Sequence, residues 1–465
     1  MTKNLNQLLN ALPPEPFHSA LEEIRKVIRQ LGKTIVVLDD DPTGTQTVYD
    51  TPVLTTWDVP AICAEFQQKT SLFYILTNSR SFPSSEAEAL AHEIGANLVE
   101  ASQQTGQGFT VISRSDSSLR GHFPEEVDAL TETLGIAHAT KVLIPAFVEG
   151  GRYTIQDIHY VQDRDELIPA AETPFAQDAA FGYKNSDLKL WVEEKTQGAI
   201  KASSIISLSI ADIRQKGVAH IVQKLLDCPE KSVCVVNAAS RSDLEIAGLA
   251  LLEAMARGKA LIFRTAASIV PVLAGLPPKP LLTTDQLSIQ KGKGGLIIIG
   301  SYVPKTSSQL EHLKTQTHLK FLEIDVADLL SDKREKTIQQ ISQTVDHHLQ
   351  NGETLVIYTS RTLITGEDKA SSLHIGNLVS EGLVSIVNNI STQPAYVLAK
   401  GGITSSDIAT KGLGIKRAMV WGQILTGVPV WKPGKESKFP GVPYLVFPGN
   451  VGGPEALSEI IKKLS

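Results

Sequence analysis

Short apolar runs alternate with amphipathic helical patterns along the chain, and this alternation limits the fold more than any other feature. Runs rich in Val, Ile and Leu predict strands at 35–38, 72–77, 108–112, 141–144 and 232–236. Helical patterns at 84–103 and 124–133 separate several of these strands. Successive strand, helix and strand form a βαβ unit, in which the strands are parallel. We therefore predict an α/β fold with a mostly parallel sheet and ligand chemistry at the carboxyl ends of its strands.

The same alternation of strand and helix patterns resumes after a stretch rich in proline and glycine. Between residues 275 and 295 no apolar periodicity is long enough for an element, which is typical of a linker. Beyond it we predict strands at 296–301, 354–358 and 395–399 and helices at 307–315 and 370–387. A chain of 465 residues usually forms more than one core. We predict two α/β domains, 1–280 and 294–465, joined by a linker at 281–293, with a ligand cleft between them.

Composition narrows the class of protein. Hydrophobic residues make up 42% of the chain and charged residues 20%, which is typical of a soluble globular protein. The net charge of −6 argues against nucleic-acid binding, so we expect a small-molecule partner. Three cysteines without metal-like spacing favour a reducing cytoplasm over a disulfide framework. The amino terminus lacks the apolar core of a signal peptide, and no apolar run is long enough to cross a membrane, so we predict a cytoplasmic protein without membrane contact.

Residues 39–44, Asp-Asp-Asp-Pro-Thr-Gly, follow directly on the predicted strand at 35–38. A strand that ends in three carboxylates delivers them to the carboxyl edge of its sheet. Because adjacent like charges repel, they persist most naturally where a metal ion, a cationic side chain or a substrate hydroxyl engages them. The alternative is a solvated loop in which one aspartate caps the next helix, and residues 39–44 alone do not decide between the two interpretations.

Two further polar clusters follow predicted strands of the first domain. Residues 113–122 combine hydroxyls, Asp116 and two arginines, a set suited to a polyhydroxylated acid, with Arg120 the better anchor for a carboxylate. A helix-entry turn capped by Asp116 is the alternative interpretation. Residues 145–154 pair a Gly-Gly sequence with Arg152, so the backbone can approach a ligand closely while the guanidinium supplies charge.

Glycine-rich turns recur at three positions in the second domain, at 300–301, 401–407 and 449–455. Glycines leave backbone N–H groups unshielded at a helix start, where they can hold phosphate oxygens. Each turn alone is equally an ordinary tight turn, but three in one domain favour phosphate binding. The chain lacks the G-x-x-x-x-G-K-[ST] sequence, and neither domain has G-x-G-x-x-G after its first strand, which argues against a P-loop ATPase and an NAD-binding protein.

Taken together, these motifs resemble the four-carbon acid sugar kinase family in both sequence and order. The matching segments are 40–44, 113–121, 145–152, 300–301, 401–404 and 449–452. The resemblance covers essentially the whole chain. It implies an amino-terminal domain that binds the sugar acid and a carboxy-terminal domain that binds ATP.

The resemblance also implies roles for individual residues. Asp40 and Asp41 stand at the family's Asp-Asp-x-Thr-Gly sequence, where either would serve as the catalytic base. Asp39 stands outside this pair and would cap or orient the turn. The implied substrate-binding residues are Thr43, Gly44, Asp116, Ser117, Arg120 and Arg152. The implied ATP-binding residues are Ser301, Gly401, Gly402, Ile403, Thr404, Gly449 and Asn450.

The activity implied is phosphorylation, with ATP and Mg²⁺, of a hydroxyl of a four-carbon acid: a 3-oxo-tetronate, a tetronate, or a branched relative such as 3-oxo-isoapionate. Arg114 and Ser118 depart from the lysine and threonine usual in the family, so the compound stays open. Closure of the two domains about the linker would join donor and acceptor and exclude water. A non-catalytic sensor of sugar acid and nucleotide is the alternative. The metal ligands stay unassigned, and a homo-oligomer is compatible with the sequence.

Overall fold

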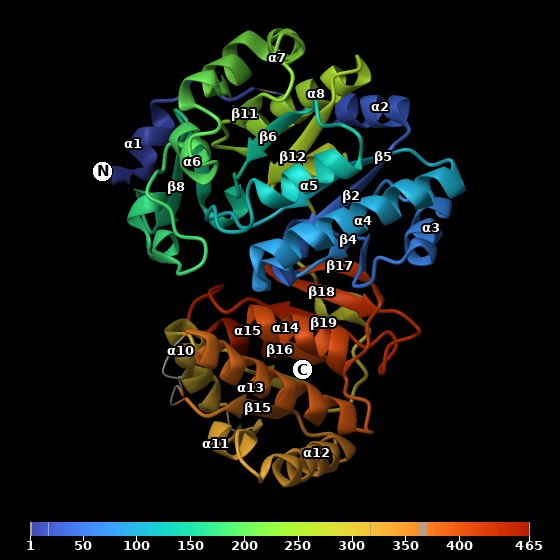
Figure 1. The fold of residues 1–465 in the computed structure, drawn as a ribbon. Helices are drawn as coiled ribbons and strands as arrows, with labels where there is room; N and C mark the ends of the chain where they lie inside the picture. The colour runs from blue at the N-terminus through green and yellow to red at the C-terminus, as the bar shows by residue number, and fades with distance from the viewer. Residues whose placement is uncertain (1, 17, 317, 362–363, 365–368, 465) are drawn as a thin grey trace. The chain divides into compact units, whose positions relative to one another are not determined.

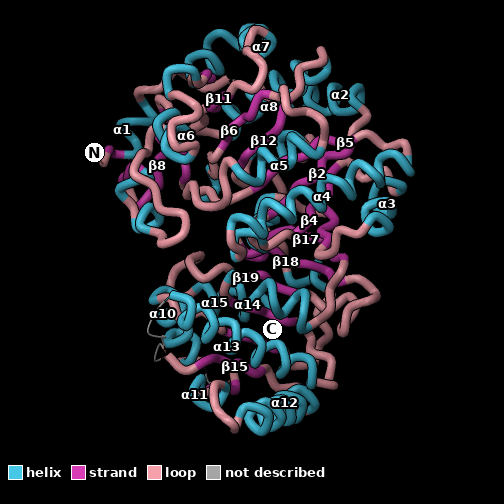
Figure 2. Tube along the Cα trace, in the orientation of Figure 1, coloured by secondary structure: helices cyan, strands magenta, loops and turns pink. Residues whose placement is uncertain are grey.

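The computed structural model describes residues 2–16, 18–316, 318–361, 364 and 369–464. The chain forms two compact units, in each of which strands alternate with helices (Figures 1 and 2). The first unit contains Met1–Val48 and Thr56–Pro278, and the second contains Tyr49–Thr55 and Lys279–Ser465. Among the described residues no helix is long and apolar enough to cross a membrane.

The main sheet of the first unit has the strand order β10-β11-β6-β12-β5-β2-β4, and each pair of neighbouring strands is parallel. Its strands are β2 (Thr34–Asp39), β4 (Leu72–Leu76), β5 (Phe109–Arg114), β6 (Thr140–Ile144), β10 (Ile206–Leu208), β11 (Val233–Val236) and β12 (Leu261–Thr265). After β2 the chain adds β4 on one side and β5 on the other, so the order of strands reverses at β2. Such a reversal is where open α/β sheets bind ligands.

Helices cover both faces of this sheet, which explains why β2 and β4 are buried along their whole length. Helices α3, α4 and α5 pack together on one face, and α2, α7, α8 and α9 form the other layer (Figure 1). Their bounds are α2 (Leu21–Leu31), α3 (Val59–Gln67), α4 (Ser84–Thr105), α5 (Glu125–Thr133), α7 (Gly217–Leu226), α8 (Arg241–Ala256) and α9 (Ile269–Leu273). The sequence encodes some of these ends directly, as where Ser240 and Asp243 form a capping box that starts α8.

A small antiparallel sheet, which the sequence analysis did not predict, accompanies the main sheet. Its order is β1-β9-β8-β7, with β1 (Lys3–Asn4), β7 (Arg152–Ile155), β8 (Ile158–Asp163) and β9 (Glu166–Pro169). Two more helices belong to this region, α1 (Leu5–Asn10) and α6 (Leu188–Lys195). Because β7 follows the loop after β6, the small sheet fixes Arg152 close to the carboxyl edge of the main sheet.

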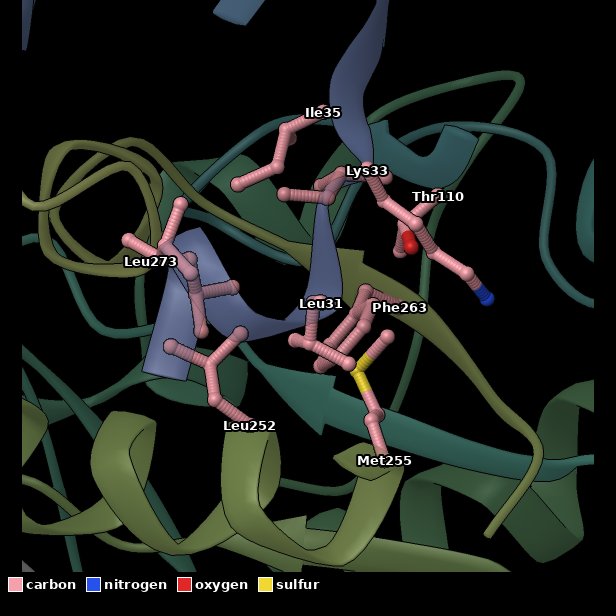
Figure 3. Close-up of a pocket in the computed structure, with 10 residues that line it drawn as sticks. Leu31, Lys33, Ile35, Thr110, Leu252, Met255, Phe263 and Leu273 are labelled. Carbon is pink, nitrogen blue, oxygen red and sulfur yellow. The ribbon is translucent and has the colours of Figure 1, made fainter. Parts of the chain in front are cut away.

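An apolar cavity lies at the opposite, amino-terminal end of the main strands (Figure 3). Ile35, Thr110 and Phe263 line it from the sheet, and Leu252 and Met255 line it from α8. Aliphatic and aromatic side chains dominate this lining, so the cavity offers packing space and little chemistry. The polar clusters are confined to the other end of the strands.

The second unit combines parallel and antiparallel strands. Parallel pairs join β14-β15-β13-β16-β19, and antiparallel pairs continue through β18 and β17 to β3. The bounds are β3 (Thr51–Leu54), β13 (Leu296–Ile299), β14 (Lys320–Ile324), β15 (Leu355–Thr359), β16 (Val397–Lys400), β17 (Arg417–Leu425), β18 (Val428–Pro433) and β19 (Tyr444–Phe447). The order reverses at β13, which lies between β15 and β16. The carboxyl ends of β13 and β16 are thus the expected ligand edge.

Helices pack on this second sheet in two groups. Helix α10 packs with α15, and α13 packs with α11, α12 and α14. Their bounds are α10 (Pro304–Lys314), α11 (Val326–Leu329), α12 (Arg334–Gln350), α13 (Lys369–Asn389), α14 (Gly402–Asp407) and α15 (Ala456–Leu464). An apolar core that includes Ile297, Leu398 and Leu445 joins the central strands to α10 and α15. The prediction of an α/β fold with mostly parallel sheets is confirmed.

Candidate functional site

The acidic turn after β2 is built around its own side chains. Residues Pro42–Thr47 form a short 3-10 helix, and the Asp41 carboxylate caps it by accepting the Thr43 N–H at 2.8 Å. Gly44 packs against the Asp39 carboxylate so closely that an added Cβ would overlap it. Asp41 is therefore the capping residue, and the expectation that Asp39 caps the turn is not supported by a hydrogen bond.

Asp39 is the most buried of the three acids. Its Oδ1 pairs with Nη1 of Arg114 at 2.9 Å, and both side chains are almost fully buried. Burial raises the pKa of Asp39 to about 7, because desolvation outweighs the attraction of Arg114. This pair lies beneath the turn and fixes the ends of β2 and β5 to each other.

Asp40 has one satisfied oxygen and one free oxygen. Ser115 Oγ donates to Oδ2, whereas Oδ1 has no hydrogen-bond partner among the described residues. Arg80 and Arg114 lie 3.7 and 3.8 Å from Oδ1, close enough for charge attraction but too far for a hydrogen bond. The Asp40 side chain is only 3% exposed, so Oδ1 lies in a buried environment next to two positive charges.

Asp41 is more exposed, at 15%, and both of its oxygens are engaged. Oδ2 pairs with Arg80 while Oδ1 accepts from Thr43. Burial alone would raise the pKa of Asp41, but the Arg80 charge and the Thr43 hydrogen bonds outweigh it and hold the pKa below its usual value. Asp41 therefore stays ionised and has a lower affinity for a proton.

A second group of charges follows β5. Asp116 Oδ2 accepts from Arg120 Nε at 2.7 Å, and Arg120 Nη1 lies 3.5 Å from Asp178. The Arg120 guanidinium also lies over the Phe175 ring, 5.1 Å from its centroid. Asp116 pairs with Arg120, and the next described helix, α5, begins at Glu125 with Pro124 at its N-cap, so the alternative interpretation of a helix entry capped by Asp116 is wrong.

Arg152 approaches the same aromatic ring from β7, with its guanidinium carbon 6.0 Å from the Phe175 centroid. One of its nitrogens donates to the Gly150 carbonyl, while Nε is buried without a hydrogen-bond partner among the residues the structure describes. Burial lowers the pKa of Arg152 from its very high ordinary value. A buried guanidinium with a free donor is suited to an anionic ligand group.

Gly121 lets these groups pack together. Its φ of +112° lies in the region that favours glycine, and an added Cβ would lie 2.7 Å from Arg264 Nη2 and 2.9 Å from Asp40 Oδ2. Arg264, at the end of β12, donates to the Arg120 carbonyl at 3.2 Å. The ends of β2, β5 and β12 thus converge on one charged cluster, as parallel neighbours must.

The second unit has a different kind of edge, in which backbone predominates. Ser301 follows β13, the Gly401–Thr404 segment follows β16 and starts α14, and Gly449 follows β19. Gly401 has φ +120°, and a Cβ there would lie 3.0 Å from the Ser301 Cβ. A Cβ at Gly449 would lie 3.1 Å from Ser301 Oγ. The three turns therefore meet, and glycine is what leaves space between them.

Three side chains support these turns. Thr306 Oγ1 donates to the Gly449 carbonyl at 3.2 Å, and Lys305 Nζ donates to the Asn450 carbonyl at 3.2 Å. Lys400 is fully buried, donates to the Pro448 carbonyl at 3.0 Å and has its pKa lowered to about 7 by burial. The loop after β19 is thus held from both α10 and β16.

Comparison with known families matches the two halves of the chain separately. Residues 35–273 match a family described as a sugar-binding N-terminal domain. Residues 296–457 match a family described as a nucleotide-binding C-terminal domain. The chain belongs to the four-carbon acid sugar kinase family.

Two relatives in this family carry names. A D-erythronate kinase from Heliobacterium modesticaldum is 24% identical over 295 residues, which are 60% of this chain and 61% of the relative. A D-threonate kinase from Salmonella typhimurium is 22% identical over 353 residues, which are 74% of this chain and 76% of the relative. The alignment to the first of them thus spans about three fifths of that protein's length.

Solved structures share the fold. A protein from Salmonella typhimurium LT2 has a TM-score of 0.67 at 20% identity, covering 92% of this chain and 98% of its own. A protein from Haemophilus influenzae has a TM-score of 0.62 at 18% identity, covering 92% and 100%. At these identities the likeness concerns the fold alone.

The residues selected from the sequence fall into two groups, one at each carboxyl edge. In the first unit, Asp40, Asp41, Thr43 and Gly44 follow β2, Asp116, Ser117 and Arg120 follow β5, and Arg152 begins β7. In the second unit, Ser301 follows β13, Gly401 follows β16, Gly449 and Asn450 follow β19, and the first turn of α14 contains Gly402, Ile403 and Thr404. The Ile403 side chain is 57% exposed. The roles of these residues stay predictions.

Sequence reasoning missed three charged residues that act on the acids by contact or by charge. Arg80 follows β4 by four positions and pairs with Asp41, a strand-end position that could have been noticed. Arg264 lies inside β12, a strand that was not predicted. Glu126 lies on α5, and nothing in its local sequence distinguishes it from Glu125. No group of three His, Cys, Asp or Glu side chains is placed to hold a metal ion within the described ranges.

Proposed function

We propose that this protein is an ATP-dependent kinase that phosphorylates a hydroxyl of a four-carbon sugar acid. The observation that carries the proposal is the buried Asp40 carboxylate with one free oxygen, surrounded by arginines at the carboxyl edge of the unit that matches a sugar-binding domain. Phosphoryl transfer needs a positioned hydroxyl, an acceptor for its proton and positive charge nearby, and this cluster can supply all three.

The sugar acid binds through its carboxylate to Arg120 and Arg152. Both guanidiniums lie by the Phe175 ring, and Arg152 Nε is a buried donor without a described partner. A carboxylate with two oxygens can accept two parallel hydrogen bonds from one guanidinium, which fixes its orientation as well as its charge. Asp116 accepts from Arg120 Nε and Asp178 lies 3.5 Å from Nη1, and these two acids hold the guanidinium in place for the ligand.

Asp40 is the proton acceptor in preference to Asp41. Its Oδ1 is free, whereas Asp41 uses one oxygen on Thr43 and the other on Arg80. The pKa of Asp41, lowered by the Arg80 charge and the Thr43 hydrogen bonds, also disfavours Asp41 as a base. As the O–P bond forms, the hydroxyl proton passes to Asp40, and Arg80 offsets the remaining charge.

ATP is held by the glycine turns of the second unit. The space beside Ser301 that a Cβ at Gly401 or Gly449 would fill is suited to phosphate oxygens, and the exposed Lys305 adds positive charge. Magnesium, when bound with ATP, neutralises phosphate charge, and it prefers oxygen ligands. Asp41, the more exposed acid of the pair, would hold it through a water.

The acid substrate belongs to the tetronate class. Relatives named as D-erythronate and D-threonate kinases support a four-carbon core, and the resemblance extends the candidates to 3-oxo-tetronates and to branched acids such as 3-oxo-isoapionate. An aldonic acid of this length places a carboxylate and a hydroxyl within one small site, which matches the short span from Arg120 through Asp116 to Arg80.

A screen of ADP release over four-carbon acids and their 3-oxo and branched forms tests the proposal. We expect ADP release to depend on one of these acids and a phosphorylated acid to appear in equal amount by ³¹P NMR. Binding of acid and nucleotide without any ADP release would support the sensor alternative and contradict the kinase. A change in nicotinamide absorbance in parallel assays would point to an oxidoreductase instead.

A further inference from the structure

A small cavity has Asp40 in its lining. It lies between the sheet and the layer formed by α4 and α5, and its volume is about 10 Å³, the order of room that one water needs. The rest of the lining includes aliphatic side chains such as Ala87 of α4, and polar side chains, which are those of Thr77, Ser79, Ser113, Arg114 and Glu126. A water needs two to four polar partners, and this lining supplies them.

Two of these polar groups have unused hydrogen-bonding capacity. Asp40 Oδ1 and Arg114 Nε are buried and have no hydrogen-bond partner within the part of the chain that the structure describes. A buried polar atom without a partner is costly, which favours a bound water at this place. Such a water can accept from Arg114 Nε and donate to Asp40 Oδ1.

Glu126 lies on the other side of the same cavity. It is 8% exposed, and Ser79 Oγ donates to its Oε1. The charged groups that act on it are Arg264 of β12, Asp40 in the turn after β2 and Glu125 of its own helix. Burial raises the pKa of Glu126 to about 7, so its carboxylate takes up a proton near neutral pH.

We propose that Glu126 serves the phosphoryl transfer as a proton relay, receiving the proton from Asp40 through a water in this cavity. This inference rests on the proposed kinase function. Glu126 acts through Asp40 and has no contact with the substrate.

The relay balances without any further reactant. The substrate O–H bond breaks as its oxygen bonds to the transferred phosphorus, and the proton goes to Asp40. Asp40 then gives a proton to the cavity water, which gives one of its own to Glu126. Glu126 releases the proton to solvent after turnover, which accounts for the proton that phosphorylation of an alcohol by ATP produces near neutral pH.

The test compares E126Q with E132Q. Glutamine keeps the shape of Glu126 and can still accept from Ser79, whereas Glu132 is an exposed residue of the same helix and serves as the control. We expect E126Q to lower kcat by about 10- to 100-fold while the KM values for the acid and for ATP change less than about twofold. E126D, which keeps a carboxylate, should recover part of the loss, and E132Q should match the wild type.

The pH profile separates a relay from a packing role. Glu126 must be ionised to receive a proton, so wild-type kcat should fall as the pH drops below about 7. E126Q should lose this dependence over pH 6–8. Equal kcat and an unchanged profile in E126Q would overturn the relay, and so would an E126D enzyme no better than E126Q.

An infrared titration gives a readout that needs no turnover. Asp39 loses its proton in the same pH range, so the two proteins are compared by difference. As the pH rises through about 7, the protonated-carboxyl C=O band should lose more intensity in the wild type than in E126Q. An equal loss of intensity in both proteins would overturn the assignment. If the wild type releases no ADP with any of the acids, the kinase proposal fails. If the wild type is active and E126Q is equally active, only the relay fails.

Discussion

The carboxyl edges of the two units are built from different chemical groups. The edge of the first unit, here called the charged edge, is made of charged side chains, with Asp40 and Arg114 buried and Arg80 half-buried beside them. The edge of the second unit is made mainly of backbone, with glycines at 401 and 449 where side chains would block the approach. A small polyhydroxylated acid needs directional side-chain contacts, whereas phosphates are held well by N–H groups and a few cations. Under the proposed function, the first edge would hold the acid and the second would hold ATP, and their residue types suit these two ligands.

Replacing Asp40 with asparagine should have the largest effect, because it removes the proton acceptor at the charged edge. We expect D40N to lower kcat by about 100- to 10,000-fold, measured by ADP release. D41N should chiefly raise KM for the acid, since Asp41 orients Arg80 and the turn.

The exposed Asp163 provides the matched control, and D163N should behave as the wild type. Urea denaturation of each variant checks that the fold is intact. If D40N and D41N both retain full turnover in a folded protein, the assignment of the base to this pair is wrong.

At the glycine edge, G401A should impair ATP use and leave acid binding unchanged. Gly401 has φ +120° and ψ 144°, a conformation that residues with a side chain rarely adopt, and the new methyl group would press on Ser301. We expect KM for ATP to rise about 10- to 100-fold, with acid affinity measured by calorimetry unchanged. Alanine at Gly414, which has φ +61° but open space around it, controls for backbone strain alone. Equal effects of the two variants on KM for ATP would contradict a phosphate site at Gly401.

The contrast between the edges also explains what the sequence could reveal. Asp40, Asp116 and Arg120 follow runs of apolar residues, so their convergence follows from β2 and β5 being parallel neighbours. Arg264 was missed because a charged residue inside β12 interrupts the apolar pattern, and the acids whose charge offsets part of the cost of its burial are distant in the sequence. Glu126 was missed because its burial depends on packing against Ser79 and the cavity, which no local pattern encodes.

At the glycine edge, formed by the turns after β13, β16 and β19, the sequence predicted the turns but not the contacts that bring them together. Glycine repeats after strands are visible in the sequence, and α14 does begin at Gly402. Thr306 and Lys400 support the loop after β19, and they reach it because β13, β16 and β19 lie close together in the sheet. These contacts could not be predicted because β19 was not predicted. The domain bounds at 280 and 294 stay a prediction.

A smaller effect concerns the pH dependence of stability at the charged edge. His159 is fully buried, donates from Nε2 to the Ser117 carbonyl at 2.7 Å, and has its pKa lowered to about 4 by burial. The unfolded chain protonates this histidine near pH 6.5, so its contribution to stability is complete above pH 6.5 and is lost as the pH falls towards 4. At pH 5 the loss is about 2 kcal/mol.

Urea denaturation of the wild type and of H159Q at pH 7.5 and pH 5 measures this loss as a difference between the two proteins. The comparison is needed because the raised pKa values of Asp39 and Glu126 act in the opposite sense, favouring the fold as the pH falls. Glutamine can still donate to Ser117. An identical pH dependence in both proteins would show that His159 is not the group responsible.

The smallest effect should come from Lys305, the exposed cation of the glycine edge. Its Nζ donates to the Asn450 carbonyl at 3.2 Å from the first turn of α10, where it adds charge next to the phosphate turns. We expect K305A to raise KM for ATP about fivefold at low ionic strength, and less at 0.5 M salt, because exposed charges are screened. Lys314 ends the same helix beside Glu311, and K314A should leave KM for ATP unchanged. A salt-independent loss in K305A would mean that the lysine acts by holding the Asn450 loop, which would make this edge depend on a side chain in the way the charged edge does.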